Sequence, residues 1–371
     1  MSRVWRLHTK TKVSVKNKLE TKVANELIKR KIVAIGWTLR EDIYNELTDV
    51  EKNRLEANEK LIKYDFKKYK EIIEEDSYMT IKGKKKNFFN GKVNANLIRL
   101  NNLEKDDLIW IRSKGKYYLG RVTEKSHYLY AYRDSKKNSG ILKIGINNQF
   151  TDIEWQKIGS ESDIPGRILI AFYHKGTLIE IDEKSVLDIS QILYNKRDNY
   201  YKIPNKIVNN KENFYDLLSP YDCEDLLYFY LYHKNKYIAI PSTNKTSTQN
   251  YEFEMVNPKD RNEKIYIQVK NGYSKGSDLY LENFKGIDGI VYLLTTAGNI
   301  YETKTKKKLL QIDFKQNYEF EEIGSTENNK KIYVVNPEAL YEFAKKAYKN
   351  ENVLMPQSIL QWFEYLEEEK E

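Results

Sequence analysis

The chain has 371 residues, enough for two domains with separate cores, and its 40% hydrophobic and 32% charged residues are typical of a soluble globular protein. Its single cysteine, Cys223, excludes an intrachain disulfide and a cysteine-cluster zinc site, no apolar run is long enough to span a membrane, and the N-terminus lacks the apolar stretch of a signal peptide. The formal net charge of +9 fits a polyanionic partner, so we expect a cytoplasmic protein that binds nucleic acid and no membrane.

Residues 1–195 are predicted to form a β-rich domain with the architecture of a small barrel. Alternating or continuous apolar runs indicate strands at residues 3–7, 32–37, 107–112, 117–122, 128–132, 166–173 and 177–181. Apolar residues at helical spacing indicate helices within residues 41–75 and over residues 184–194.

A linker and a second domain are predicted to follow. Residues 196–213 are rich in Asn, Lys and Asp, a composition typical of an interdomain linker. Within residues 214–371 the patterns indicate, in order, a helix, three strands, a short helix, a strand and two C-terminal helices. Their predicted bounds are 221–233, 237–240, 251–256, 264–270, 278–284, 289–295, 337–350 and 355–369.

The strands at residues 251–256 and 264–270 are predicted to pair as a hairpin around the turn at residues 257–262. Side chains alternate between the two faces of a strand. The side chains expected to face a core are Phe253, Met255, Ile267 and Val269. Those expected on the opposite face are Glu252, Glu254, Gln268 and Lys270. Carboxylates beside a lysine suit a divalent-metal phosphodiesterase, although an ordinary cross-strand ion pair on an amphipathic hairpin gives the same pattern.

Three motif positions occur in order in the second domain: Glu224 in the first helix, Glu252 in the second strand with Glu254 as the alternative acid, and Gln268-Val269-Lys270 in the third strand. In these features residues 214–301 resemble the PD-(D/E)xK nuclease superfamily, in particular its Mrr-like restriction endonuclease branch. The resemblance implies a restriction-endonuclease-like αβββαβ core, and hence a chain of mixed α+β or α/β class with C-terminal helices.

The resemblance also implies phosphodiester hydrolysis with Mg²⁺, or with Mn²⁺ in its place. Glu252, Glu224 and the carbonyl oxygen of Val269 would hold the ion, Gln268 would complete the catalytic motif, and Lys270 would help to activate water and stabilise the transition state. The sequence departs from the family pattern, because a glutamate replaces the usual aspartate and Gln268 is neutral. Mg²⁺ accepts an amide or carbonyl oxygen and keeps several waters, so this donor set suffices for one ion.

The first domain resembles, more loosely, PUA-like or EVE-like sensor domains in residues 35–37, 103–110 and 118–122. Such domains hold a flipped, often modified base in an aromatic pocket. This implies Trp37, Trp110 and Tyr118 as pocket walls, whereas a tryptophan inside an alternating strand is also typical of a core. In the second domain, Lys245 is a candidate contact to the scissile phosphate and equally a surface lysine without a role.

These features together predict a modification-dependent DNA endonuclease, resembling type IV restriction enzymes, in bacterial antiviral defence. Its expected partner is DNA, including modified phage DNA, and cutting both strands would require a homodimer. The alternative is a catalytically degenerate nuclease fold that binds DNA or RNA, or an interaction protein of a defence system. The chain contains no GxSxG, GxxxxGK[ST] or GxGxxG motif, which leaves serine-hydrolase, P-loop and dinucleotide-binding functions without support.

Overall fold

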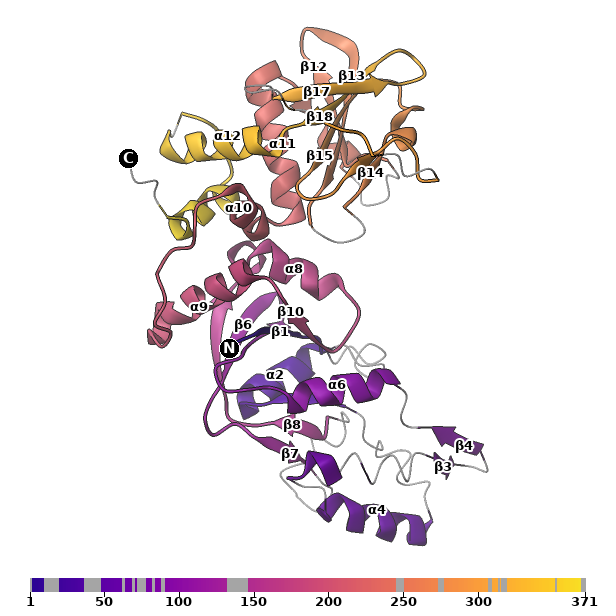
Figure 1. Cartoon of the computed structure of the whole chain (residues 1–371), viewed down its shortest axis with the longest axis vertical. Helices are drawn as coiled ribbons and strands as arrows, with labels where there is room; N and C mark the ends of the chain where they lie inside the picture. The colour runs from indigo at the N-terminus through magenta and orange to yellow at the C-terminus, as the bar shows by residue number, and fades with distance from the viewer. Residues whose placement is uncertain are drawn as a thin grey trace. The chain divides into compact units, whose positions relative to one another are not determined.

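The chain divides into two compact units in the computed structural model (Figure 1). Unit 1 consists of Met1–Ile164 and Ala171–Ile203, and unit 2 of Pro165–Ile170 and Pro204–Glu371. The residues that the structure describes are 2–9, 20–36, 48–61, 64–68, 71, 78–81, 84–87, 91–131, 146–244, 250–272, 277–305, 309–312, 314, 319–350 and 352–367. The change between the units at Ile203 falls inside the segment 196–213 that the sequence suggests as a linker.

Unit 1 is built on a five-stranded sheet with the strand order β10-β1-β5-β6-β9. Its strands are β1 (Val4–Leu7), β5 (Leu108–Ser113), β6 (Lys116–Val122), β9 (Ile153–Gly159) and β10 (Leu178–Ile181). The β1–β5 pair is parallel and the other pairs are antiparallel. Strands β5 and β6, both predicted as strands, pair as a hairpin, and Lys114 and Gly115 between them have φ of 51° and 68°. Positive φ at both central residues is the requirement of a type I′ turn, whose twist matches that of the strands.

Helices cover both faces of this sheet. They are α2 (Glu20–Arg30), α6 (Gly91–Asn101) and α9 (Lys184–Asp198). Unit 1 also contains α4 (Asp49–Leu61) and the short turn η2 (Glu161–Asp163), which follows β9. Helix α9 packs against β1 and β9, whereas α2 packs against β5. The side chains of Ile109 and Ile111 join a fully buried core with Leu27 of α2 and Leu97 of α6. Trp110 lies on the opposite face of β5 and donates from its indole N–H to Ser190 of α9, so alternation along β5 supplies buried side chains to both faces.

The remaining strands of unit 1 form two further sheets. One has the order β2-β8-β7, and the other pairs β3 with β4. Their bounds are β2 (Val33–Ile35), β3 (Tyr78–Ile81), β4 (Lys84–Asn87), β7 (Tyr128–Tyr130) and β8 (Asn148–Phe150). Within the described residues of unit 1, none of the sheets closes into a barrel. The helices and sheets together confirm the mixed α+β class, whereas the predicted small barrel is not seen in the described residues.

The segment predicted as a strand at residues 166–173 is instead a helix, α8 (Gly166–Tyr173). Its apolar run is compatible with a buried strand or a buried helix, and periodicity alone does not separate the two. Pro165 precedes the helix, and its carbonyl oxygen accepts the backbone N–H groups of Ile168 and Leu169. Proline at the start of a helix and glycine beyond its end, here Gly176, are the signals that indicate a helix.

Unit 2 contains a six-stranded sheet with the order β11-β12-β13-β15-β18-β17. Its strands are β11 (Ile238–Ala239), β12 (Phe253–Asn257), β13 (Asp260–Lys270), β15 (Ile290–Thr295), β17 (Phe320–Ser325) and β18 (Lys331–Val335). Strands β13, β15 and β18 are parallel, and the outer pairs are antiparallel. The predicted hairpin of β12 and β13 is confirmed, with a turn at Pro258 and Lys259 that is shorter than expected.

Helix α11 (Pro220–Asn235) covers one face of the unit 2 sheet. The other helices, α10 (Lys211–Leu217), α12 (Pro337–Lys349) and α13 (Gln357–Leu360), pack against α11 or against one another, and α13 runs into the 3₁₀ turn η5 (Gln361–Tyr365). Helix α11 packs against β13 and α12, and Tyr228 of α11 meets Phe253 of β12 edge-to-face at 6.2 Å. Ser219 caps this helix in a capping box with Asp222, and Pro220 occupies its first position.

Short elements cover the opposite face of the sheet. They are η3 (Pro241–Thr243), β14 (Leu279–Tyr280), η4 (Leu281–Phe284) and β16 (Ile300–Tyr301). Leu281 and Phe284 pack there with Leu293 and Val334 of the sheet. The predicted helix at residues 278–284 is thus a short strand followed by a 3₁₀ turn.

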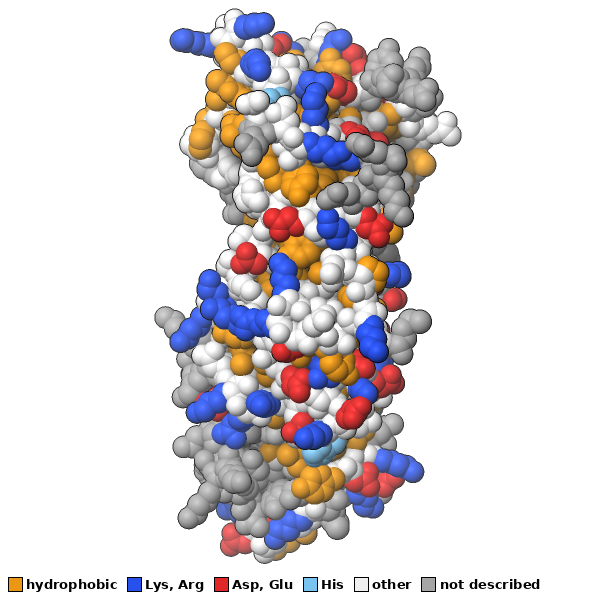
Figure 2. Space-filling view, turned by 90° about the vertical axis from the view of Figure 1, so that its left-hand side faces the viewer, with side chains coloured by type: hydrophobic (Ala, Val, Ile, Leu, Met, Phe, Trp, Pro, Cys, Tyr) orange, Lys and Arg blue, Asp and Glu red, His pale blue; other side chains and the backbone are white. Residues whose placement is uncertain are grey.

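The surface carries both signs of charge. On the face shown in Figure 2, Lys and Arg side chains are interspersed with Asp and Glu, so the net positive charge is not concentrated there. None of the described helices is both long enough and apolar enough to cross a bilayer.

A Gly166→Ala substitution is expected to destabilise unit 2. A Cβ atom at Gly166 would lie 1.7 Å from the backbone carbonyl oxygen of Leu218, so the backbone has to move. Overpacking of this kind costs about 1–3 kcal/mol, which denaturant unfolding can measure. Gly286→Ala is the matched control, because nothing lies within 4 Å of its added Cβ. Equal effects of the two substitutions would contradict the close approach at Gly166.

Candidate active site

The hairpin register brings Glu252 and Gln268 opposite each other. Phe253 pairs with Ile267, and the backbone N–H of Glu252 donates to the carbonyl oxygen of Ile267 at 2.7 Å. Glu252 precedes β12 and Lys270 ends β13, and because the two strands are antiparallel both residues lie at the same end of the strands, which we call the sheet edge. The predicted alternation agrees with burial, since Phe253 and Ile267 are buried on the side of α11.

Two polar side chains, those of Gln268 and Lys270, converge on one carboxylate oxygen of Glu252 at this edge. The amide Nε2 of Gln268 donates to Oε1 of Glu252 and, at 3.2 Å, to the carbonyl oxygen of Val269. The Nζ atom of Lys270 lies 3.5 Å from the same Glu252 oxygen. Gln268 is buried, whereas the Glu252 and Lys270 side chains are 27% and 39% exposed. An external ligand can therefore reach the carboxylate and the ammonium group.

Helix α11 contributes Glu224 to this neighbourhood. Burial raises the pKa of Glu224 to about 7, and the negative charge of Glu252 adds to the shift. Asp225 acts in the same direction, and the positive charge of Lys270 opposes it. Glu224 is thus electrostatically coupled to both Glu252 and Lys270, so its carboxyl group lies within range of both charges.

Backbone and side-chain contacts hold the first turns of α11 at the same sheet edge. Asn271, directly after β13, donates from Nδ2 to the carbonyl oxygen of Leu218 at 3.0 Å. Leu218 lies just before the Ser219 cap of the helix. The chain entering α11 is therefore fastened to the chain leaving β13, which explains why Glu224 and Lys270 influence each other.

The alternative acid, Glu254, belongs to a different pair. Its carboxylate lies 3.7 Å from Nζ of Lys264, and its backbone N–H donates to Oγ1 of Thr243. Glu254 is opposite Tyr266 in the register, two positions away from the Glu252 pair. Between the two candidate acids, Glu252 is the one that contacts Gln268 and Lys270.

The proposed base-contacting residues are placed differently from the hairpin residues. Trp37 and Lys245 lie outside the described residues. Trp110 is fully buried in the sheet, and its indole Nε1 donates to Oγ of Ser190 at 3.1 Å. It therefore has no exposed ring face on which a base could stack and occupies the position of a core residue. Tyr118 is half-buried and packs against the core.

The sheet edge offers oxygen atoms of the kinds that Mg²⁺ uses as ligands. The described residues hold no group of three or more His, Cys, Asp or Glu side chains placed to bind a metal. They do hold two carboxyl groups, Glu224 and Glu252, and the charge of Glu252 adds to the effect of burial in raising the pKa of Glu224. Mg²⁺ usually binds through one or two carboxylates and retains several waters. A divalent cation would relieve the repulsion, and the carbonyl of Val269 offers a further oxygen.

Two supporting features could not be found by the sequence motifs. Thr296 donates from Oγ1 to Asn271 Oδ1 at 2.7 Å, and its backbone N–H donates to the carbonyl oxygen of Lys270 at 3.1 Å. Arg167 and Asp216 form a buried ion pair near the same segment. The Asn271-Gly272 pair directly after the QxK motif is a local signal for a turn. Arg167 is about a hundred residues away in sequence, and no local pattern predicts its position near this turn.

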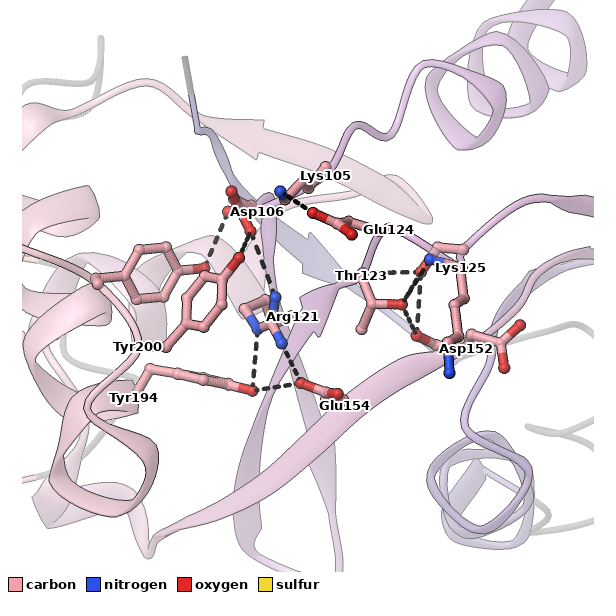
Figure 3. A network of polar contacts seen from close by, with 12 residues as sticks. Lys105, Asp106, Arg121, Thr123, Glu124, Lys125, Asp152, Glu154, Tyr194 and Tyr200 are labelled. Atoms are coloured by element: carbon pink, nitrogen blue, oxygen red, sulfur yellow. Dashed lines mark hydrogen bonds and ion pairs between the residues drawn. The ribbon is translucent and has the colours of Figure 1, made fainter.

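A second polar network lies in unit 1, around Arg121 (Figure 3). Its guanidinium group contacts Asp106, Glu154 and Tyr194 and lies 3.7 Å above the ring of Tyr200. The Tyr200 hydroxyl also donates to Asp106, at 2.8 Å. With Arg121 only 8% exposed, the network fastens the end of unit 1 to its sheet and leaves little of the guanidinium for a ligand.

No protein-family model matches the chain, and no curated protein or solved structure matches it. The resemblance to PD-(D/E)xK nucleases therefore rests on the sequence motifs.

The raised pKa of Glu224 gives a testable dependence of stability on pH. Because its pKa in the folded protein is about 7, against 4.5 for the unperturbed group, the folded state retains a proton that the unfolded state loses as pH rises between these values. The free energy of unfolding should therefore decrease from about pH 4.5 to about pH 7, by about 1–2 kcal/mol after allowance for solvent screening. Denaturant unfolding in EDTA measures this slope.

Glu224→Gln is expected to remove that part of the slope. A slope that stays the same in Glu224→Gln would contradict the assignment.

Proposed function

We propose that this protein is a metal-dependent endodeoxyribonuclease of the PD-(D/E)xK type. The observation that carries the proposal is the convergence of Gln268 and Lys270 on one oxygen of Glu252, with Glu224 coupled to them by charge. Acids and a lysine at one sheet edge are the groups that phosphodiester hydrolysis requires.

Each side chain has a distinct role in the proposed reaction. Glu252 and Glu224, with the carbonyl oxygen of Val269, would hold Mg²⁺ or Mn²⁺. The bound ion would neutralise phosphate charge and lower the pKa of a water molecule. Gln268 orients the Glu252 carboxylate through its hydrogen bond. Lys270, held 3.5 Å from Glu252 and partly exposed, directs its ammonium group toward a phosphate oxygen that gains negative charge.

We further propose that unit 1 senses modified bases and that the protein acts in antiviral defence in the bacterial cytoplasm. The sequence motifs that resemble PUA-like or EVE-like domains motivate the sensing role, although the described residues of unit 1 show neither a barrel nor an exposed Trp110. The net charge of +9 supports DNA, including modified phage DNA, as the substrate. A homodimer would allow both strands to be cut.

A second candidate is a nuclease fold that binds DNA or RNA, or a partner protein, without cutting. The specific observation in its favour is that the Gln268 amide already donates to both Glu252 and the carbonyl of Val269, two of the proposed metal ligands. The described residues also lack a third acid at this edge.

To test this proposal, the purified full chain is incubated with hydroxymethylated, glucosylated, methylated and unmodified DNA. Cleavage of at least one substrate with Mg²⁺ or Mn²⁺, and none in EDTA, is the expected result. DNA binding without cleavage of any substrate would favour the non-cutting alternative.

A further inference from the structure

A buried ion pair lies beside the segment that follows Lys270. Nε of Arg167 donates to Oδ1 of Asp216 at 2.7 Å, and the two side chains are 9% and 10% exposed. A buried charge is costly unless it is paired, so each partner strongly constrains the position of the other. Arg167 lies in the first turn of α8, and Asp216 lies in α10.

Gly272 shows where the Arg167 guanidinium lies relative to the candidate site. Its φ of +130° favours glycine, and a Cβ atom there would lie 3.0 Å from Nη1 of Arg167. The guanidinium group therefore packs against the backbone two residues after Lys270. Gly272 lacks a side chain where the arginine needs the space.

Asn271, which lies between Lys270 and Gly272, is held by two further contacts. Asn271 contacts the carbonyl oxygen of Leu218 and the hydroxyl of Thr296, and Gly272 N–H donates to the same hydroxyl at 3.3 Å. Leu218 is two residues after Asp216, so the ion pair and the Asn271 hydrogen bond act on neighbouring parts of one segment. These contacts fix the direction in which the chain leaves β13.

We propose that Arg167 is a positioning residue for Lys270. Arg167 packs against Gly272, and its ion pair with Asp216 holds the segment whose Leu218 carbonyl oxygen accepts a hydrogen bond from Asn271. Arg167 thereby keeps the end of β13 in the conformation that places Nζ of Lys270 against Glu252. Arg167 acts through the backbone and has no need to touch DNA or metal. The inference rests on the proposed function only in treating Lys270 as the catalytic lysine.

The double variant Arg167→Met/Asp216→Leu tests this role. Replacing a buried ion pair with apolar residues of similar size is often close to neutral for stability, whereas removing one partner leaves an unpaired charge. The variant should therefore fold while losing the contact at Gly272. Gly272→Ala provides a second disturbance, because it keeps the ion pair but places a methyl group against Nη1.

The first measurement is the rate at which an amine-reactive reagent labels Lys270 in the metal-free full chain, followed by mass spectrometry. Lys264, 3.7 Å from Glu254 on the same hairpin, is the internal control. We expect Lys270 to be labelled at least about threefold faster in both variants, because it leaves Glu252, and Lys264 to be unchanged. Unchanged labelling of Lys270, or equal acceleration of both lysines, would overturn the proposal.

The second measurement is DNA cleavage, which separates this proposal from the proposed function. A misplaced catalytic group should lower kcat by about ten- to a hundredfold with little change in KM. If the wild-type protein cuts no DNA, the nuclease function fails, and the labelling result still decides whether Arg167 positions Lys270. If wild type cuts and the variants match its kcat, the positioning role is refuted.

Discussion

Lys270→Met is expected to lower kcat for Mg²⁺-dependent DNA cleavage by about a hundred- to a thousandfold. The substitution keeps most of the length of the side chain and removes the cation that would stabilise charge on the phosphate. Because Lys270 is 39% exposed, its loss should leave the folded structure and DNA affinity nearly unchanged. Single-turnover cleavage and DNA binding in EDTA measure the two effects.

Lys264→Met is the matched control for this experiment. Lys264 lies on the same strand and contacts Glu254 at 3.7 Å, so the two lysines have similar environments in different cross-strand pairs. The control should retain cleavage within a fewfold of wild type. Equal losses in the two variants would indicate a general effect of charge, and full activity of Lys270→Met would show that the reaction occurs elsewhere.

Glu252→Gln is expected to reduce cleavage by a comparable factor for a different reason. The amide can still accept the hydrogen bond from Gln268, so the hairpin should fold, but one of the two carboxylates that would hold the cation is lost. Cleavage rates across a range of Mg²⁺ concentrations measure the effect. Removing the Glu252 charge should also lower the pKa of Glu224, which carbon-detected NMR can follow independently of activity.

Glu254→Gln is the control for this second substitution. Glu254 lies on the same strand but contacts Lys264 rather than Lys270. Its substitution should leave both cleavage and the Glu224 pKa close to their wild-type values. If Glu254→Gln abolishes cleavage and Glu252→Gln does not, Glu254 is the motif acid.

The hairpin could be predicted from the sequence because its information is local. Alternation with a period of two residues determines which side chains share a face, and a short turn determines which of them are opposite. Glu252, Gln268 and Lys270 therefore followed from the sequence. The choice between Glu252 and Glu254 did not, because both lie on the same face and only the register, with Phe253 opposite Ile267, separates them.

Features that depend on distant contacts could not be predicted in the same way. The run of apolar residues in α8 carries no periodicity that separates a helix from a strand, and its flanking Pro165 and Gly176 were the available signal. Strands β17 and β18 were missed because β17 is a partly exposed edge strand and β18 depends on pairing with β15. The pairing of Arg167 with Asp216 spans 49 residues and left no local pattern.

Aromatic residues in strands show the same limit. Trp110 lies in a strand where both neighbours, Ile109 and Ile111, are also buried, so alternation does not indicate an exposed ring. Its role became clear only from the hydrogen bond to Ser190 of α9, 80 residues later in the sequence. A tryptophan in a central strand covered on both faces is a core residue whatever its chemistry could offer a base.

If Glu224 and Glu252 share one divalent cation, as we propose, a calorimetric titration of the full chain with Mg²⁺ will detect it. We expect about one ion bound per chain in wild type and in Glu254→Gln, and a loss of binding in Glu252→Gln and Glu224→Gln. Unchanged Mg²⁺ binding in Glu252→Gln and Glu224→Gln would contradict the claim.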